Sequence, residues 1–509
     1  MTAKAPNVVI VMADQMAPAF LPIYGHALTR APNLEALARD GVVFENAYCN
    51  SPLCAPSRAS FMSGLLPSHT HVYDNAAEFA AAVPTFAHLM RIRGYHTILS
   101  GKMHFCGPDQ LHGFEQRLTT DIYPADFNWT PDWEHPDQRP SWYHNMSSVR
   151  DAGVCVRTNQ LDFDDEAAFM AERAIFDIAR ARDRRPFLLV ASFSHPHDPF
   201  AVQRRYWDHY RDSDIDMPGP AIPPEALDPH SRRLRHVCNM DAEPVTEAQV
   251  RAARHAYYGA ITYVDDLVGR LMAALRAAGL AEDTIVALTS DHGEMLGDRG
   301  LWYKMSFFDG ASRVPLVIAS PARFAPRRVA ASVSLVDLMP TLIDISGGNA
   351  QSLGLALDGR SLAGHLGGAG GHDEALGEYL AEGAIAPIVM IRRGAYKFIH
   401  SPADPDQLYD LGRDPGERDN LAKKTENAAD LAAFRTEVGK RWDLAALDAD
   451  VRASQRRRRL VDAALTKGEI RAWDFQPFRD ATRQYIRNSM DLDDLEAMAR
   501  FPPVAGASN

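Results

Sequence analysis

Polar side chains follow several of the predicted strands at the points where those strands end. They are Asp14 after residues 7–12, Lys102 and His104 after residues 95–99, His197 after residues 187–193, and Asp291 and His292 after residues 284–289. Ligands of mainly parallel sheets collect at the carboxyl ends of the strands, so one site can hold all of these groups. Carboxylates, imidazoles and ammonium groups are also the side chains that most often move protons in catalysis.

The most informative stretch is residues 54–64, which reads Cys-Ala-Pro-Ser-Arg-Ala-Ser-Phe-Met-Ser-Gly. Pro56 suits a first helical turn and Gly64 suits a helix end, so an ordinary helix start is one interpretation. A cysteine next to a helix N-terminus has a lowered pKa, so a reactive thiol at Cys54 is another. Arg58 lies one helical turn after Cys54, on the same face.

The pattern Cys54-x-Pro56-x-Arg58, followed by small, apolar, Ser and Gly residues, resembles the modification signature of type I sulfatases. In that family the cysteine is oxidised after translation to formylglycine. The resemblance extends in order to residues 6–14, 101–104, 196–199 and 291–293 and to Lys304. It implies an alkaline-phosphatase-like α/β fold, sulfate ester hydrolysis, a divalent cation and a partner machinery that generates formylglycine.

The resemblance also implies a role for each residue at the site. The metal ligands would be Asp14, the modified Cys54, Asp291 and His292, with Gln15 left open as a further oxygen donor. Oxygen-rich ligation suits a hard cation, and we favour Ca²⁺ with Mn²⁺ and Mg²⁺ as alternatives.

An alkyl sulfate needs an activated nucleophile, positive charge on the sulfuryl oxygens and a proton for the leaving oxygen. One hydroxyl of a formylglycine hydrate can attack sulfur, and the other can then expel sulfate. The remaining roles are Arg58 for holding the hydrate, Lys102, Lys304 and Asn75 for the sulfuryl oxygens, His197 with Lys304 as general acid, His104 as base, and His195 as a structural residue.

Several segments resemble the choline sulfatases within this family: residues 107–114, 119–127 and 129–131 and the tail from Trp473. The resemblance implies hydrolysis of choline sulfate to choline and sulfate. A quaternary ammonium requires aromatic faces and a carboxylate, because it has no N–H to donate. We expect Trp129 in this cage with Asn145 nearby, and Glu382 and Asp493 as countercharges.

Two positions depart from the common sulfatase pattern. Asp14-Gln15 replaces the two adjacent aspartates of many members, and Asp291-His292 replaces Asp-Asn. Both variants also resemble phosphonate monoester and phosphodiester hydrolases of the same superfamily, which therefore stay open as an alternative, as do other alkyl or aryl sulfatases. A non-enzymatic binding or structural homologue is the remaining alternative.

Short apolar runs alternate with helical patterns over the first two-thirds of the chain. The predicted strands are residues 7–12, 42–47, 95–99, 187–193, 284–289 and 314–319, and the predicted helices are residues 33–39, 56–63, 85–93, 166–182, 247–278 and 336–345. This alternation indicates a large, mainly parallel sheet between helices.

We predict a catalytic α/β domain over residues 1–346, a Gly-rich linker over 347–371, a smaller α+β domain over 372–470 and an extended arm over 471–509. The small domain should contain a hairpin at 388–400. The four arginines at 456–459 indicate a solvated helix face or an interface. The arm carries aromatic residues with little periodicity, so we expect it to join subunits of a dimer or tetramer.

The overall composition is that of a globular protein: 509 residues, 46% apolar and 24% charged, with a net charge of −12. The negative charge disfavours a nucleic-acid partner. No apolar run approaches the roughly 18–20 residues of a membrane span. The five cysteines are scattered without a CxxC pair, so we expect no disulfides and a cytoplasmic location.

Overall fold

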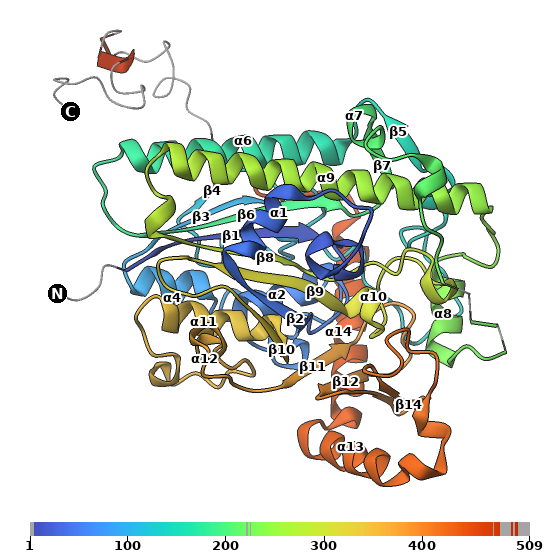
Figure 1. Ribbon diagram of the computed structural model, residues 1–509. Coiled ribbons are helices and arrows are strands. Elements are labelled where there is room, and N and C mark those ends of the chain that lie inside the picture. The colour runs from blue at the N-terminus through green and yellow to red at the C-terminus, as the bar shows by residue number, and fades with distance from the viewer. Residues whose placement is uncertain are drawn as a thin grey trace.

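The centre of the molecule is an eight-stranded sheet (Figure 1). The computed structural model describes residues 5–219, 222–223, 225–471, 473–478, 490–491 and 494–496. The strand order is β10 (Arg327–Ser334), β2 (Gly41–Tyr48), β9 (Arg313–Ala319), β8 (Thr284–Ser290), β1 (Asn7–Asp14), β6 (Phe187–Pro196), β3 (His96–Gly101) and β4 (Gln116–Arg117). Only β9 runs antiparallel to its neighbours among the described strands of this sheet. The predicted mainly parallel α/β sheet is therefore confirmed.

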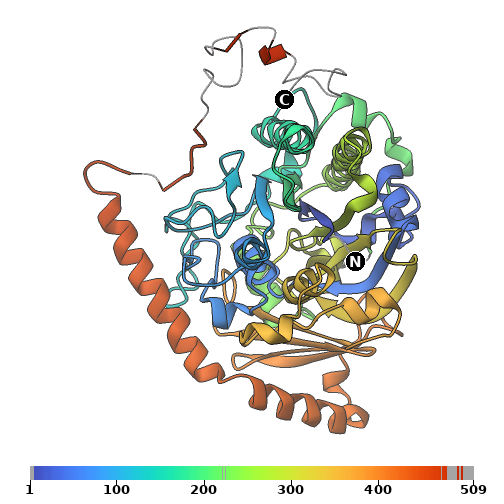
Figure 2. The same cartoon turned by 90° about the vertical axis from the view of Figure 1, so that its left-hand side faces the viewer.

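Helices cover both faces of the sheet (Figures 1 and 2). Val9 and Val11 of β1 pack into the core formed with helices on one face, and Val8 and Ile10 pack into the core on the other. The first face carries α1 (Pro32–Arg39), α6 (Asn159–Arg180) and α9 (Glu247–Ala277), and the second carries α2 (Cys54–Ser63), α4 (Phe86–Ile92), α11 (Leu338–Ile345) and α12 (Ala363–Gly367). All eight residues of β1 are buried, as expected for a strand covered on both faces.

All six predicted strands and all six predicted helices are present, with ends shifted by a few residues. The start of α6 is the largest shift, because Thr158 caps the helix by accepting a hydrogen bond from the Leu161 backbone N–H. The edge strand β10 was not predicted. Its first half is partly exposed and begins with Arg327 and Arg328, so its apolar signal is weak.

A second sheet of four antiparallel strands lies beside the first. Its strands are β11 (Glu374–Tyr379), β12 (Ile388–Arg393), β13 (Tyr396–Ser401) and β14 (Asp404–Asp410). The predicted hairpin is β12–β13, with Gly394 at a φ of 57° in its turn. Helix α13 (Ala428–Arg441) packs on this sheet, and α14 (Leu444–Leu465) continues along the side of the molecule (Figure 2).

The remaining α-helices and strands of the described chain are short. They are α3 (Pro67–Thr70), α5 (Ser147–Arg150), α7 (Arg204–Trp207), α8 (Pro229–Val237), α10 (Asp309–Ser312), β5 (Gly153–Cys155) and β7 (Ala201–Gln203). Within the described chain, none of the helices has the length and apolar character needed to cross a bilayer. All five cysteines are described, and all carry free thiols.

Candidate active site

Cys54 is the first residue of α2 and is almost completely buried. The side-chain oxygen of Asn75 accepts the backbone N–H of Ala55 at 2.9 Å, and Gly64 ends the helix with a φ of 70°. Burial and the nearby Asp14 carboxylate raise the pKa of the Cys54 thiol to about 12. The interpretation of Cys54 as a thiol with a lowered pKa is therefore wrong, because burial and Asp14 outweigh the helix N-terminus.

Three further side chains surround the Cys54 sulfur. Nε2 of His292 lies 3.2 Å from Sγ, and Oδ1 of Asp14 lies 3.9 Å from it. Asp14, Cys54, Asp291 and His292 each place one ligand atom within 4.8 Å of the others, and all four are buried. Nδ1 of His292 donates to the Gly293 carbonyl at 3.0 Å, which leaves the Nε2 lone pair free to bind a cation. This donor set fits a divalent cation.

Arg58 ties the cluster to four adjacent strands of the large sheet. Its Nη2 donates to Asp14 Oδ2 and its Nε to Asp291 Oδ2, both at 2.8 Å. Its Nη1 donates to the Lys102 carbonyl at 2.6 Å and to Ser192 Oγ at 2.9 Å. Burial opposes ionisation of Asp14, but Lys102, His197 and Arg58 hold the pKa of its carboxyl well below the usual value. Arg58 thus forms ion pairs with two buried carboxylates and fixes their positions.

The side chain of Gln15 bonds Lys304 and Glu294. Its Oε1 accepts a hydrogen bond from Lys304 Nζ at 2.6 Å, and its Nε2 donates to Glu294 Oε2 at 2.5 Å. Glu294 was not predicted as a site residue, although it stands only two positions after His292. Its other oxygen accepts backbone N–H groups, and burial raises its pKa to about 7. The contacts of Gln15 therefore orient Lys304.

Two buried lysines bring positive charge to the site. Lys102 Nζ forms an ion pair with Asp14, lies 3.7 Å from Cys54 Sγ and sits 4.1 Å from the centre of the Tyr123 ring. Burial opposes the charge of Lys102, but Asp14 and Cys54 raise its pKa above the ordinary value. Lys304 also keeps a raised pKa against burial, because Cys54 and Asp198 favour its charge. Both lysines therefore stay protonated where an anion would bind.

His197 is hydrogen-bonded on both sides of its ring. Nδ1 lies 2.6 Å from the Asp198 carbonyl and Nε2 lies 2.7 Å from Lys304 Nζ. Nδ1 must donate, because a carbonyl only accepts, and Nε2 then accepts from Lys304. Burial and Lys304 hold the pKa of His197 well below its usual value. His144, which the sequence did not single out, lies 3.4 Å from the same ammonium group.

His104 has a different environment. Its ring centre lies 5.2 Å from that of Tyr123 and 5.9 Å from that of Trp129. Among the described residues, neither ring nitrogen has a hydrogen-bond partner. Burial and Lys102 lower the pKa of His104 to about 3, so the imidazole is neutral. His195 instead bonds Asp164 at 2.7 Å, in keeping with its expected structural role.

A cavity of about 320 Å³ joins these groups. Its lining includes Cys54, Asn75, Tyr123, Trp129, Trp142, His144, Asn145, His197, Lys304 and Glu382. Glu382 is only 3% exposed, and its Oε2 has no hydrogen-bond partner in the described part of the chain. Burial, with Asp74 nearby, raises the pKa of Glu382 to about 7. Of the predicted pocket residues, Asp493 lies outside the described residues.

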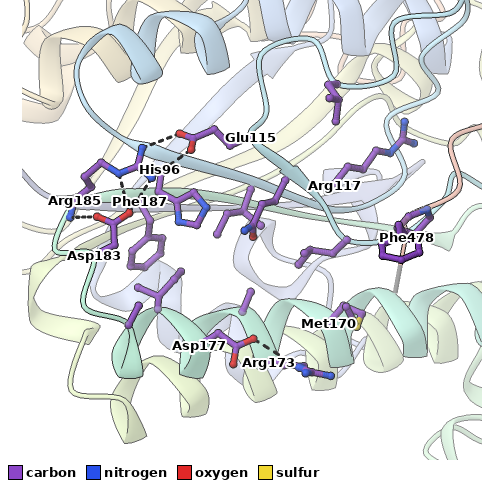
Figure 3. Close-up of a pocket in the computed structure, with 18 of the residues that line it drawn as sticks. His96, Glu115, Arg117, Met170, Arg173, Asp177, Asp183, Arg185, Phe187 and Phe478 are labelled. Carbon is purple, nitrogen blue, oxygen red and sulfur yellow. Dashed lines mark hydrogen bonds and ion pairs between the residues drawn. The ribbon is translucent and has the colours of Figure 1, made fainter. Parts of the chain in front are cut away.

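A larger hollow of about 840 Å³ lies between β3, β4 and α6 (Figure 3). Figure 3 shows Arg117, Met170 and Phe478 at one end, where the tail meets the body of the molecule. At the other end, Arg185 bonds Glu115 at 2.9 Å. Among the described residues that line this hollow, none belongs to the predicted site. The site is therefore defined by its chemistry and not by the size of the cavity.

Comparison with known proteins agrees with this geometry. The family model described as sulfatase matches residues 6–348, the model of the choline sulfatase C-terminus matches 449–501, and the C-terminal model of N-sulphoglucosamine sulphohydrolase matches 297–441. A choline-sulfatase of Rhizobium meliloti is 48% identical over 99% of both chains. An arylsulfatase of Clostridium perfringens is 30% identical over 67% of this chain and 75% of its own.

The fold is also similar to that of a solved structure. The phosphonate monoester hydrolase of Agrobacterium radiobacter superposes with a TM-score of 0.69 at 28% identity, covering 88% of this chain and 96% of that one. The family requires a metal ion and a formylglycine, and the buried cluster around Cys54 provides for both. Site, sequence and fold agree: the chain belongs to the sulfatase family.

Proposed function

We propose that this enzyme hydrolyses choline sulfate to choline and sulfate. The main support for the proposal is the lining of one cavity. Side chains suited to bind a sulfate ester and side chains suited to bind a quaternary ammonium both line it. Cys54 and Lys304 serve the sulfate, and Trp129 and Glu382 serve the cation. Full-length similarity to a choline-sulfatase supports this assignment.

At the sulfate end of the cavity, side chains of the protein hold the cation and orient the sulfate group. Asp14, Asp291, His292 and the modified Cys54 would hold the cation. A formylglycine hydrate at residue 54 would supply the nucleophilic hydroxyl, and the cation would lower the pKa of that hydroxyl. Two more residues act on the sulfuryl oxygens. Lys102 neutralises their charge, and Asn75, whose oxygen is committed to Ala55, offers its NH₂ group to them.

We favour Ca²⁺ as the cation, because two of the four ligands are carboxylates. Mn²⁺ is the alternative that the His292 imidazole suits best, and Mg²⁺ is the third. Elemental analysis of protein purified from its own host without added metal tests this assignment. A stoichiometric Mn²⁺ or Mg²⁺ content would overturn it.

The Lys304–His197 pair delivers the proton to the leaving alcohol. Lys304 Nζ and His197 Nε2 share one proton across their hydrogen bond. The pair acts as the general acid when this proton passes to the leaving oxygen, which becomes the alcohol hydroxyl and leaves the pair neutral. His104, whose ring nitrogens have no hydrogen-bond partner among the described residues, is the base that takes the proton when sulfate is released.

The choline head group binds between aromatic rings and a carboxylate. The Trp129 ring lies 5.4 Å from that of Tyr123 and 6.3 Å from that of Trp142 in a stacked arrangement. Each aromatic face contributes about 0.5–2 kcal/mol to binding of a desolvated cation. Glu382 supplies the countercharge, and Asn145 lies in the same lining. A second countercharge from Asp493, which lies outside the described residues, stays a prediction.

A second candidate function is phosphonate monoester or phosphodiester hydrolysis. The Asp14-Gln15 and Asp291-His292 pairs and the structural similarity to a phosphonate monoester hydrolase favour it. The test is a panel of choline sulfate, 4-nitrophenyl sulfate and a phenyl phosphonate monoester. We expect the highest kcat/KM with choline sulfate. A higher value with the phosphonate would overturn the proposal, and a higher value with the nitrophenyl ester would indicate a general aryl sulfatase.

We further infer a homo-oligomer joined by the arm, in a reducing cytoplasm where a formylglycine-generating system acts on Cys54. Described residues at the start of the arm contact their own chain: Trp473 packs on Phe127 at 5.2 Å, and Arg117 lies 5.5 Å from the centre of the Phe475 ring. Peptide mass spectrometry of Cys54 from protein made in its own host tests the modification directly.

A further inference from the structure

Helix α14 packs a row of polar side chains on the loop at residues 129–134. Arg452 donates to the Trp133 carbonyl at 3.0 Å, and Gln455 accepts the Trp133 N–H at 3.0 Å. Further along the helix, Arg456 bonds Glu134 at 2.7 Å and Arg459 pairs with Asp132. The prediction for the arginine run, a solvated helix face or an interface, is confirmed in both parts: Arg456, Arg457 and Arg459 are exposed, and Arg458 is buried against the loop. The loop that carries Trp129 is held by this helix.

Arg458 differs from the other arginines of the run because it is buried, with 6% of its surface exposed. Its two terminal nitrogens donate to the two carboxylate oxygens of Asp74, both at 2.7 Å. Nη1 also donates to Thr130 Oγ1 at 3.1 Å. This hydroxyl can accept, because its own proton goes to the Phe127 carbonyl at 2.7 Å. A planar guanidinium satisfies these contacts together, whereas an ammonium group does not match the fork.

Both partners of Arg458 adjoin residues that line the cavity. Thr130 directly follows Trp129, and Asp74 directly precedes Asn75. Asn75 in turn accepts the backbone N–H of Ala55, next to the nucleophile. One guanidinium therefore connects the side of the cavity formed by Trp129, called the Trp129 wall below, to the start of α2 at Cys54.

We propose that Arg458 is a positioning residue that sets the distance between the Trp129 wall and residue 54, and so determines selectivity for sulfate esters that carry a quaternary ammonium. Arg458 touches no substrate atom and acts through Thr130 and Asp74. The inference rests on the proposed role of Trp129 in binding the head group.

The test compares Arg458→Lys with the unmodified enzyme on choline sulfate and on 4-nitrophenyl sulfate. The quantity measured is the ratio of kcat/KM for the two substrates, which cancels any loss that both share. We expect this ratio to fall about tenfold or more, mainly through KM for choline sulfate, since small displacements of binding groups are costly. Arg457→Lys, an exposed change at the neighbouring position of the same helix, is the matched control and should leave the ratio within about twofold.

A second variant separates a local effect on the Trp129 wall from a general loss of structure. Thr130→Val removes the contact on the Trp129 side and leaves the Asp74 fork intact, so it should lower the same ratio while circular dichroism shows an intact fold. In a Trp129→Ala background, Arg458→Lys should lower the ratio no further, because both changes act through one wall.

Equal losses on both substrates in Arg458→Lys, or an unchanged ratio, would overturn the inference. If Trp129→Ala lowers the ratio while Arg458→Lys and Thr130→Val do not, only the inference fails. If Trp129→Ala also leaves the ratio unchanged, the proposed head-group pocket fails and the role of Arg458 fails with it.

Discussion

Glu382→Gln removes the negative charge from the head-group pocket while keeping the shape of the side chain. Glu382 lines the cavity, is 3% exposed and has one carboxylate oxygen without a hydrogen-bond partner among the described residues. A buried carboxylate with a free oxygen is costly unless a ligand cation compensates it. We therefore expect the change to weaken binding of choline sulfate specifically.

The size of the effect follows from the charge and its burial. At a separation of about 5 Å, set by the methyl groups of the ammonium, and an effective dielectric constant of about 20, the attraction is roughly 3 kcal/mol. The amide dipole of glutamine recovers part of this, which leaves a loss of about 2 kcal/mol. That corresponds to about a 30-fold fall in kcat/KM for choline sulfate. The loss should appear mainly in KM.

The pH dependence gives an independent check. In the proposed pocket only the ionised form of Glu382 attracts the cation, and the pKa of this carboxyl is raised to about 7. The ionised fraction therefore rises from about 10% at pH 6 to about 90% at pH 8. The ratio of kcat/KM for choline sulfate to that for 4-nitrophenyl sulfate should rise about ninefold over this range. In Glu382→Gln the ratio should not change with pH.

Glu378→Gln is the matched control. Glu378 is also a buried glutamate with a raised pKa, but its oxygens accept the N–H and hydroxyl of Ser68 and the indole N–H of Trp442, at 2.6–2.7 Å. Its replacement should lower the melting temperature and leave the substrate ratio unchanged. The head-group assignment is refuted if Glu382→Gln loses activity equally on both substrates, or if the wild-type ratio is the same at pH 6 and pH 8.

Three further predictions concern the nucleophile, the general acid and the arm. Cys54→Ala should abolish turnover of both esters while circular dichroism shows an intact fold; near-normal activity would exclude residue 54 as the nucleophile. His197→Ala should cost roughly 10²–10⁴-fold with choline sulfate but far less with 4-nitrophenyl sulfate, whose phenolate needs little protonation; equal losses would assign His197 to binding. Deleting the residues after Trp473 should give smaller particles by light scattering and poor choline sulfate turnover, and a truncated protein of unchanged size and activity would contradict a role for the arm in assembly.

Local patterns were sufficient to predict the central sheet and the types of residue at its strand ends. Apolar runs mark buried strands because each strand lies between two helical layers, and β1 is buried along its whole length. The spacing of Cys54 and Arg58 by one helical turn likewise placed both on one face of α2. These features depend only on residues close together in the chain.

Contacts between distant residues required the tertiary structure. Glu378 and Glu382 stand four positions apart and are both buried, yet packing against Ser68 and Trp442 satisfies the first, while the second keeps a free oxygen in the cavity. The thiol of Cys54 has a raised pKa because burial, which no local pattern reveals, outweighs the helix terminus.

The four arginines at 456–459 also show which features the sequence predicts and which require the tertiary structure. Its four side chains look alike in the printed sequence, and helical periodicity alone could not separate a solvated face from an interface. Only the packing of α14 on the loop at residues 129–134 buries Arg458 and leaves Arg456 exposed. Asp74, the carboxylate that pairs with Arg458, stands 384 positions earlier in the chain. Only folding brings the two together, so only the tertiary structure shows which arginine of the run is buried beside the cavity.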